Sequence, residues 1–228
     1  MPLFRWTLRS YGRAEVPLKL LAIVALAMAM AWPALAADKP VRIVAFGDSL
    51  TAGLGLPAQE AFPAKLQAAL KAKGLAANVV NAGVSGDTAS AGLERLEWSV
   101  PDGTDGIILE LGANDALRGL DPALTQKALN EILDKLAARR IPVLLAGMKA
   151  PRNLGSDYTA RFDAIYPALA STHPVVFYPF FLEGVAADPH LNQGDGLHPN
   201  AAGVDVIVAR ILPQVEELIA RAQAARGK

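Results

Sequence analysis

One stretch of this chain decides its predicted fold: Val41-Arg42-Ile43-Val44-Ala45-Phe46-Gly47-Asp48-Ser49-Leu50. Residues 41–46 are mostly apolar and several are β-branched, which is typical of a buried β-strand. The Gly-Asp-Ser turn ends this strand, and the following segment 51–57 is too rich in Gly and Pro for a core element. Because α/β proteins bind ligands at the carboxyl ends of their strands, Ser49 is a candidate nucleophile. This stretch alone also fits a serine that only closes a turn or caps a helix.

Strand and helix patterns alternate along the rest of the chain. Apolar runs predict strands at 78–82, 107–111, 142–147 and 175–178, and helical spacing predicts helices at 60–73, 88–98, 122–140, 158–171 and 201–224. Pro167 is expected to weaken the centre of the fourth helix. Alternating strands and long helices form parallel βαβ units, and near-continuous apolar strands are buried on both faces. The predicted fold class is therefore α/β, a three-layer α/β/α sandwich with a five-stranded, doubly wound parallel sheet.

Composition narrows the class of protein. The chain has 228 residues, of which 52% are hydrophobic, enough for one domain with a substantial core. It carries 22 Lys and Arg against 22 Asp and Glu, so its formal net charge is zero and it lacks the basic footprint of a nucleic-acid-binding protein. The absence of cysteine excludes disulfides, thiolate metal sites and a cysteine nucleophile.

The first 36 residues have the order of a secretory signal peptide. Four basic residues precede the apolar run 20–32, and Pro33 and the small-residue site Ala34-Leu35-Ala36 follow it. A membrane anchor is the alternative, but the uncharged run is shorter than the roughly 20 residues that a membrane-spanning helix needs. We therefore expect a signal peptide at 1–36, one catalytic domain at 37–228, and a periplasmic or secreted mature protein without a stable membrane anchor.

Separate polar segments follow the first three strands and precede the last helix. A serine hydroxyl needs a base to take its proton, and the imidazole of His198 is the candidate. Asp195, three residues upstream, could hold the imidazole in the correct tautomer. An oxyanion needs hydrogen-bond donors, and we expect them from the backbone N–H groups of Ser49 and Gly83 and from the Asn114 amide.

The segments Gly47-Asp48-Ser49-Leu50, Gly83-Val84-Ser85-Gly86-Asp87-Thr88, Gly112-Ala113-Asn114-Asp115 and Asp195-Gly196-Leu197-His198-Pro199-Asn200 resemble those of the SGNH hydrolase family, also called GDSL lipases and esterases. The resemblance covers nearly the whole predicted mature chain and is closest to the small periplasmic arylesterases, lysophospholipases and thioesterases. It implies a flavodoxin-like SGNH hydrolase fold, Ser49, His198 and Asp195 as catalytic residues, and Gly83 and Asn114 in the oxyanion hole. One departure is Ala113, where this subgroup commonly has Gly.

Some residues have competing interpretations. His173 and His190 are the other candidates for the base, and Asp188 is a second candidate for its carboxylate partner. His173 lies at a predicted helix end, which favours a cap or surface role. His190 and Asp188 lie in the predicted loop that also holds Asp195 and His198, and the three-residue spacing favours the latter pair. A metal site within 188–198 is disfavoured because no ligand spacing of a known kind is present. Asn114 could also be a helix cap or turn residue.

Three functions remain open from the sequence. The favoured one is a serine hydrolase that acts, without cofactor or metal, on aryl esters, short or medium acyl esters, lysophospholipids and acyl thioesters. A carbohydrate O-acetylesterase and a non-catalytic ligand-binding module are the alternatives. We expect small-molecule substrates as the only partners, no nucleic acid, and a monomer.

Overall fold

The structure is a computed structural model that describes residues 39–226. The predicted signal peptide and the boundary at residue 36 lie outside the described residues and stay predictions. The strands are β1 (Val41–Gly47), β2 (Ala77–Gly83), β3 (Gly106–Glu110), β4 (Val143–Ala146) and β5 (Val176–Tyr178). The α-helices are α2 (Ser49–Ala52), α3 (Phe62–Ala72), α4 (Ala89–Ser99), α5 (Ala113–Leu117), α6 (Pro122–Ala138), α7 (Ser156–Asp163), α8 (Ile165–Thr172) and α9 (Ala201–Arg226), with 3-10 turns η1 (Ala58–Glu60) and η2 (Arg152–Leu154).

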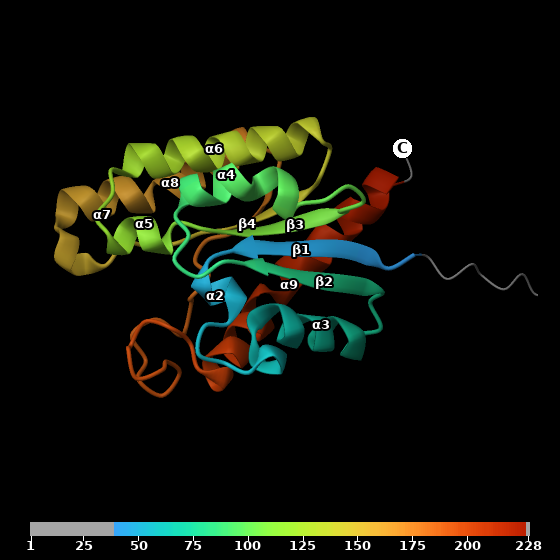
Figure 1. Ribbon diagram of the computed structural model, residues 1–228, viewed down its shortest axis with the longest axis horizontal. Helices are drawn as coiled ribbons and strands as arrows, with labels where there is room; N and C mark the ends of the chain where they lie inside the picture. The colour runs from blue at the N-terminus through green and yellow to red at the C-terminus, as the bar shows by residue number, and fades with distance from the viewer. Residues whose placement is uncertain (1–38, 227–228) are drawn as a thin grey trace, which may run out of the picture. The chain divides into compact units, whose positions relative to one another are not determined.

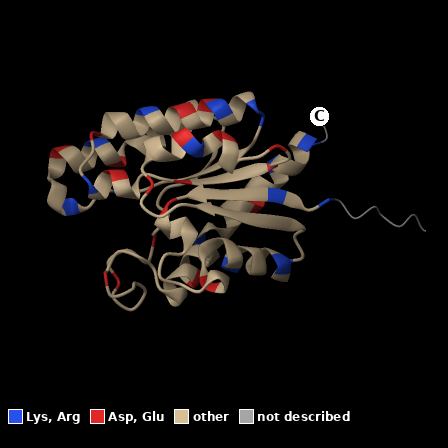
Figure 2. Ribbon diagram, in the orientation of Figure 1, with Lys and Arg blue, Asp and Glu red and all other residues tan. Residues whose placement is uncertain are grey.

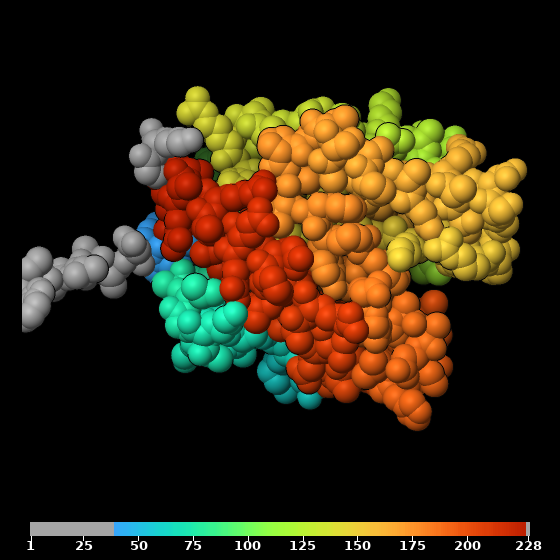
Figure 3. Space-filling model, turned by 180° about the vertical axis from the view of Figure 1, so that it is seen from behind, coloured from blue at the N-terminus to red at the C-terminus, as the bar shows by residue number. Residues whose placement is uncertain are grey.

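All five strands are parallel and lie in the order β2-β1-β3-β4-β5. Helices α4, α6 and α8 lie on one side of the sheet and α3 and α9 on the other (Figure 1). In the view from behind, α9 is the red segment that runs across the visible face of the molecule (Figure 3). This confirms the predicted doubly wound sandwich. The strand order reverses between β1 and β3, so the carboxyl ends of these two strands flank the crevice where such folds bind ligands.

The core lies where the apolar runs of the sequence predict it. Every residue of β3 and of β4 is buried, and α6 buries one apolar face that includes Leu129, Ile132 and Leu136. Each such side chain contributes about 1.5–3 kcal/mol when it leaves water. Charged residues lie mainly on the outer helices, and the strands carry few of them (Figure 2). Among residues 39–226, no helix is long and apolar enough to cross a membrane.

The predicted helix at 158–171 is wrong in one respect, because the segment forms two helices. Helix α7 ends at Asp163 and α8 begins at Ile165, so the break precedes Pro167. A proline has no N–H for the carbonyl four residues earlier, and its ring clashes with that carbonyl. The residue four positions before Pro167 is Asp163, and the proline itself sits in the first turn of α8, where it is tolerated.

Candidate active site

Three predicted site residues, far apart in the sequence, meet at the carboxyl end of the sheet. Ser49 is the first residue of α2, directly after β1. Its Oγ lies 2.9 Å from Nε2 of His198, and Nδ1 of His198 lies 2.6 Å from Oδ2 of Asp195. This chain of hydrogen bonds allows an imidazole to remove the serine proton while a carboxylate orients the ring.

Local backbone geometry fixes the Asp195 carboxylate. Its Oδ1 accepts hydrogen bonds from the N–H groups of Leu197 (2.9 Å) and His198 (3.0 Å). The backbone bond from His198, then the bond from its ring, lower the pKa of Asp195 to about 2. The carboxylate is therefore ionised at neutral pH and can stabilise an imidazolium.

The competing residues lie elsewhere or have other partners. His173 follows α8, and its Nε2 lies 2.9 Å from Oδ1 of Asn130. The Asp188 carboxylate accepts the backbone N–H of His190, which closes a local turn. Neither Asp188 nor His190 is among the residues that line the cavity at Ser49. Within residues 39–226, no three His, Asp or Glu side chains form a group that could hold a metal ion.

The segment that carries His198 is tied to the segment after α2. Gln193 lies outside the helices and strands, and its backbone N–H donates to the His198 carbonyl at 2.7 Å. The Gln193 side chain donates to the carbonyl of Leu54 at 2.7 Å. The base and the nucleophile are thereby held together by hydrogen bonds outside the catalytic chain itself.

Asp48 is a buried acid beside the nucleophile. Its Oδ1 accepts the N–H of Leu50 at 3.0 Å and caps α2, and its Oδ2 accepts Nδ2 of Asn114 at 3.1 Å. Burial raises the pKa of Asp48 to about 6. The contact with Asn114, which lies in the first turn of α5, adds a link between two site segments.

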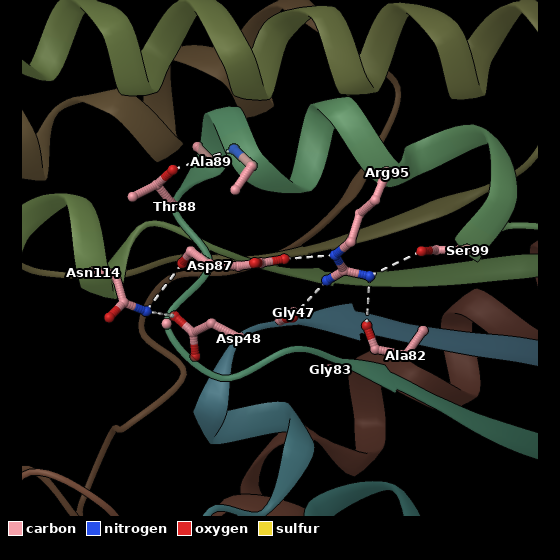
Figure 4. Close-up of polar contacts among 12 residues, drawn as sticks. Gly47, Asp48, Ala82, Gly83, Asp87, Thr88, Ala89, Arg95, Ser99 and Asn114 are labelled. Atoms are coloured by element: carbon pink, nitrogen blue, oxygen red, sulfur yellow. Dashed lines mark hydrogen bonds and ion pairs between the residues drawn. The ribbon is translucent and has the colours of Figure 1, made fainter.

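Asn114 is held from two sides (Figure 4). Besides Asp48, its Nδ2 donates to the backbone carbonyl of Asp87 at 3.0 Å. Asp87 is in turn paired with Arg95 of α4, whose Nε lies 2.5 Å from the Asp87 carboxylate. The Arg95 guanidinium also donates to the carbonyls of Ala82 (2.9 Å) and Gly47 (2.8 Å), and it lies over the Phe46 ring. Arg95, which the sequence analysis did not single out, therefore joins the ends of β1 and β2 to the turn that contacts Asn114.

The backbone N–H of Gly83, one of the predicted oxyanion donors, already has an acceptor. It donates to Oδ1 of Asn81 at 3.0 Å, and a Cβ at this position would collide with the backbone of Asp48 and Ala52. Gly83 is therefore a packing glycine beneath α2. Gly86, one residue before Asp87, has a φ of 88°, and its N–H has no hydrogen-bond acceptor within residues 39–226. Only glycine adopts this conformation readily.

A cavity of about 430 Å³ opens at Ser49. We call it the Ser49 pocket. Polar groups from Ser49, Asn114 and His198 reach it, and most of its remaining lining is apolar: Leu50, Ala113, Ala116, Leu117, Met148, Ala150, Pro151, Phe180, Leu182, Ala186, Ala187 and Leu197. The charged side chains of the lining are those of Lys149 and Arg152, both cationic. Such a site suits a substrate with an apolar portion.

Comparisons with known proteins agree with this geometry. Residues 45–206 match the model of the GDSL-like Lipase/Acylhydrolase family. The chain is 36% identical over 178 residues to Esterase TesA of Pseudomonas aeruginosa, covering 78% of this chain and 89% of that protein. It is 38% identical over 178 residues to Thioesterase 1/protease 1/lysophospholipase L1 of Escherichia coli, covering 78% of this chain and 84% of the other.

Solved structures give the same result. The crystal structure of AlinE4, a SGNH-hydrolase family esterase, is 49% identical with a TM-score of 0.67, covering 78% of this chain and 96% of that one. The crystal structure of TesA is 36% identical with a TM-score of 0.74, covering 78% and 99%. The chain belongs to the GDSL-like lipase/acylhydrolase family, the SGNH hydrolases.

Proposed function

We propose that Ser49 carries the chemistry of this carboxylic ester hydrolase through an acyl-enzyme. Ester hydrolysis follows from membership of the family, whose members compared above include esterases and a thioesterase/lysophospholipase. The observation that carries the proposal is the hydrogen-bonded chain from Ser49 through His198 to Asp195. His198 takes the proton of Ser49 as the hydroxyl attacks the ester carbonyl, and Asp195 stabilises the resulting imidazolium.

The tetrahedral intermediate needs donors at its oxyanion. We assign the N–H of Ser49 at the start of α2, the N–H of Gly86 and the amide of Asn114, and Gly86 replaces the predicted Gly83. Asn114 then exchanges one of its present acceptors for the charged oxyanion, which is the stronger acceptor. His198 returns the proton to the leaving group, and water releases the acyl group by the same steps in reverse.

The Ser49 pocket supports a single-chain acyl ester as substrate. Its walls are apolar around the catalytic serine, and Lys149 adds a cation whose Nζ lies 4.9 Å from the centroid of the Phe180 ring. Arg152 is paired with Asp163 at 2.7 Å, whereas Lys149 has no ion-pair partner among the described residues. A phosphate in the leaving group, as in a lysophospholipid or an acyl thioester of a phosphorylated carrier, would face Lys149.

The other hypotheses have less support. A carbohydrate O-acetylesterase would use an open groove with aromatic platforms, and among the described residues that line the Ser49 pocket Phe180 is the only Phe, Tyr or Trp. A ligand-binding module has no need of a complete hydrogen-bonded Ser, His and Asp. We further propose that cleavage after Ala36 yields a monomeric periplasmic or secreted enzyme.

The test is hydrolysis of p-nitrophenyl acetate, octanoate and palmitate by the mature protein and by Ser49→Ala. We expect turnover to peak at octanoate and kcat of Ser49→Ala to fall about 10⁴-fold or more. Activity on acetate alone would favour the acetylesterase. Turnover that persists in Ser49→Ala would refute the role of Ser49.

A further inference from the structure

Glu110 is a buried acid that the proposed chemistry does not use. It ends β3 directly beside Gly47 of β1, and its relative exposure is 0%. Its Oε1 is buried without a hydrogen-bond partner in the part of the chain that the structure describes. Buried polar atoms are nearly always satisfied, so an exception at the centre of a site requires an explanation.

The other carboxyl oxygen of Glu110 accepts hydrogen bonds from residues on both sides of Ser49 in the chain. Oε2 accepts the hydroxyl of Thr51 at 2.7 Å and the N–H of Asp48 at 3.4 Å. Asp48 precedes Ser49 and Thr51 follows it by two residues, so one acid contacts the chain on each side of the serine.

Gly47 makes this arrangement possible. A Cβ at position 47 would collide with Oγ1 of Thr51 and with the carboxyl and carbonyl of Glu110. The glycine of the Gly-Asp-Ser-Leu segment therefore leaves the space that the Glu110 carboxyl and the Thr51 hydroxyl fill.

We propose that Glu110 is a positioning residue for the nucleophile: its carboxyl fixes the turn from Asp48 to Thr51 and so keeps Oγ of Ser49 within reach of His198. This inference rests on the proposed function of Ser49. Glu110 does not touch the Ser49 pocket, so it acts through the turn rather than on the substrate.

The surroundings of Glu110 indicate that its carboxyl acts as a neutral acceptor. Burial, and then the charge of Asp48, raise the pKa of Glu110 well above its usual range. Tyr166 of α8 lies close to Glu110 in the chain's interior: its hydroxyl donates to the carbonyl of Leu111, the residue after Glu110, and burial raises its pKa well above the usual value. Because a neutral carboxyl and a carboxamide share an acceptor oxygen and a shape, Glu110→Gln is the conservative variant.

The experiment compares Glu110→Gln with Glu110→Leu on p-nitrophenyl octanoate. We expect Glu110→Leu to lower kcat about 10²-fold with KM changed less than about twofold, because a small displacement of a nucleophile has this effect. We expect Glu110→Gln to keep kcat within about threefold and to leave the midpoint of the acidic limb of the pH–rate profile in place. A shift of that midpoint to lower pH in Glu110→Gln would contradict a neutral Glu110, because removing a negative charge lowers the pKa of the general base that this limb reports.

Thr51→Val provides a second test if Glu110→Leu does not fold. It removes one hydroxyl bond from the same turn, and we expect about a tenfold lower kcat. Its matched control is Thr104→Val, which also loses one hydroxyl bond in the interior, to the carbonyl of Pro101, and should keep kcat. Full kcat in folded Glu110→Leu or in Thr51→Val would overturn the proposal, as would an equal loss in Glu110→Gln and Glu110→Leu. If Ser49→Ala keeps its activity, the proposed role of Ser49 is refuted, and this result is distinguishable from a failure of the Glu110 proposal alone.

Discussion

Replacing Arg95 by Met tests whether the ion pair behind Asn114 holds the site together. The side chains of Arg95 and Asp87 are 7% and 13% exposed, so the pair is nearly removed from water. Arg95→Met would leave the Asp87 carboxylate buried without its partner. It would also remove the hydrogen bonds that Arg95 donates to the carbonyls of Gly47 and Ala82, although the Gly47 carbonyl keeps the N–H of Val84.

The expected loss of stability is large. Breaking a buried ion pair by removing one partner costs about 3–5 kcal/mol, mostly because the remaining charge stays buried. For a domain of this size, each kcal/mol lowers the melting temperature by roughly 2–4 °C. We therefore expect Arg95→Met to melt about 6–20 °C below the parent protein.

Two further variants separate this mechanism from a general effect of losing an arginine. Arg139→Met is the matched control, because Arg139 donates to the carbonyl of Val100 and lies 3.7 Å from the exposed Asp102. We expect it to cost less than about 1 kcal/mol. Arg95→Met combined with Asp87→Asn removes the stranded charge and should recover at least half of the loss. Thermal and urea unfolding measure all three, and an equal effect of Arg95→Met and Arg139→Met would refute the reasoning.

Three further predictions concern the site. Asn114→Ala should lower kcat on p-nitrophenyl octanoate by about 10²–10³-fold, as loss of one oxyanion donor does, and an unchanged kcat would remove the amide from the mechanism. Asp48→Asn should raise the melting temperature more at about pH 7.5 than at about pH 4. The pKa of Asp48 is raised from 3.8 to about 6 in the folded state, so its ionised form opposes folding above pH 6 and not below pH 4. An equal shift at both pH values would contradict this. Lys149→Met should lower kcat/KM for a lysophosphatidate about fivefold relative to the monoacylglycerol of the same chain, which corresponds to ~1 kcal/mol. Lys127→Met on α6 is the control, and an equal ratio in both variants would exclude phosphate recognition by Lys149.

Much of the fold follows from local patterns. The apolar run of each strand and the helical spacing between runs were enough for a parallel sheet, because both depend on residues close in the sequence. The pair of Asp195 and His198 could be predicted in the same way, since the two residues are only three positions apart. Their approach to Ser49, which is 149 positions from His198, could be predicted only through the chemistry that a serine nucleophile requires and through the family resemblance.

The proposed exchange of Gly83 for Gly86 illustrates what local reasoning does not see. Gly83 ends β2 and Gly86 lies in the turn that follows it, and neither residue has a side chain that would block approach to its N–H. The difference between them is that the side chain of Asn81 occupies the N–H of Gly83. The Asn81 amide also donates to the carbonyl of Ala52 in α2, so its orientation depends on how α2 packs on β2, and the sequence could not show which N–H is free.

The buried titratable side chains are the part of the site that the sequence does not reveal. Glu110 lies in the apolar run of β3 and Arg95 lies in the middle of α4, so neither position suggests a functional site in the sequence. In the structure, Arg95 and Glu110 contact the end of β1 or the turn that follows it, and Asp48 lies in that turn and accepts the N–H of Leu50. Burying such groups is costly, and a core of this size could be packed with apolar side chains at lower cost. Their concentration around one turn is therefore better explained by the placement of Ser49 than by the stability of the sheet.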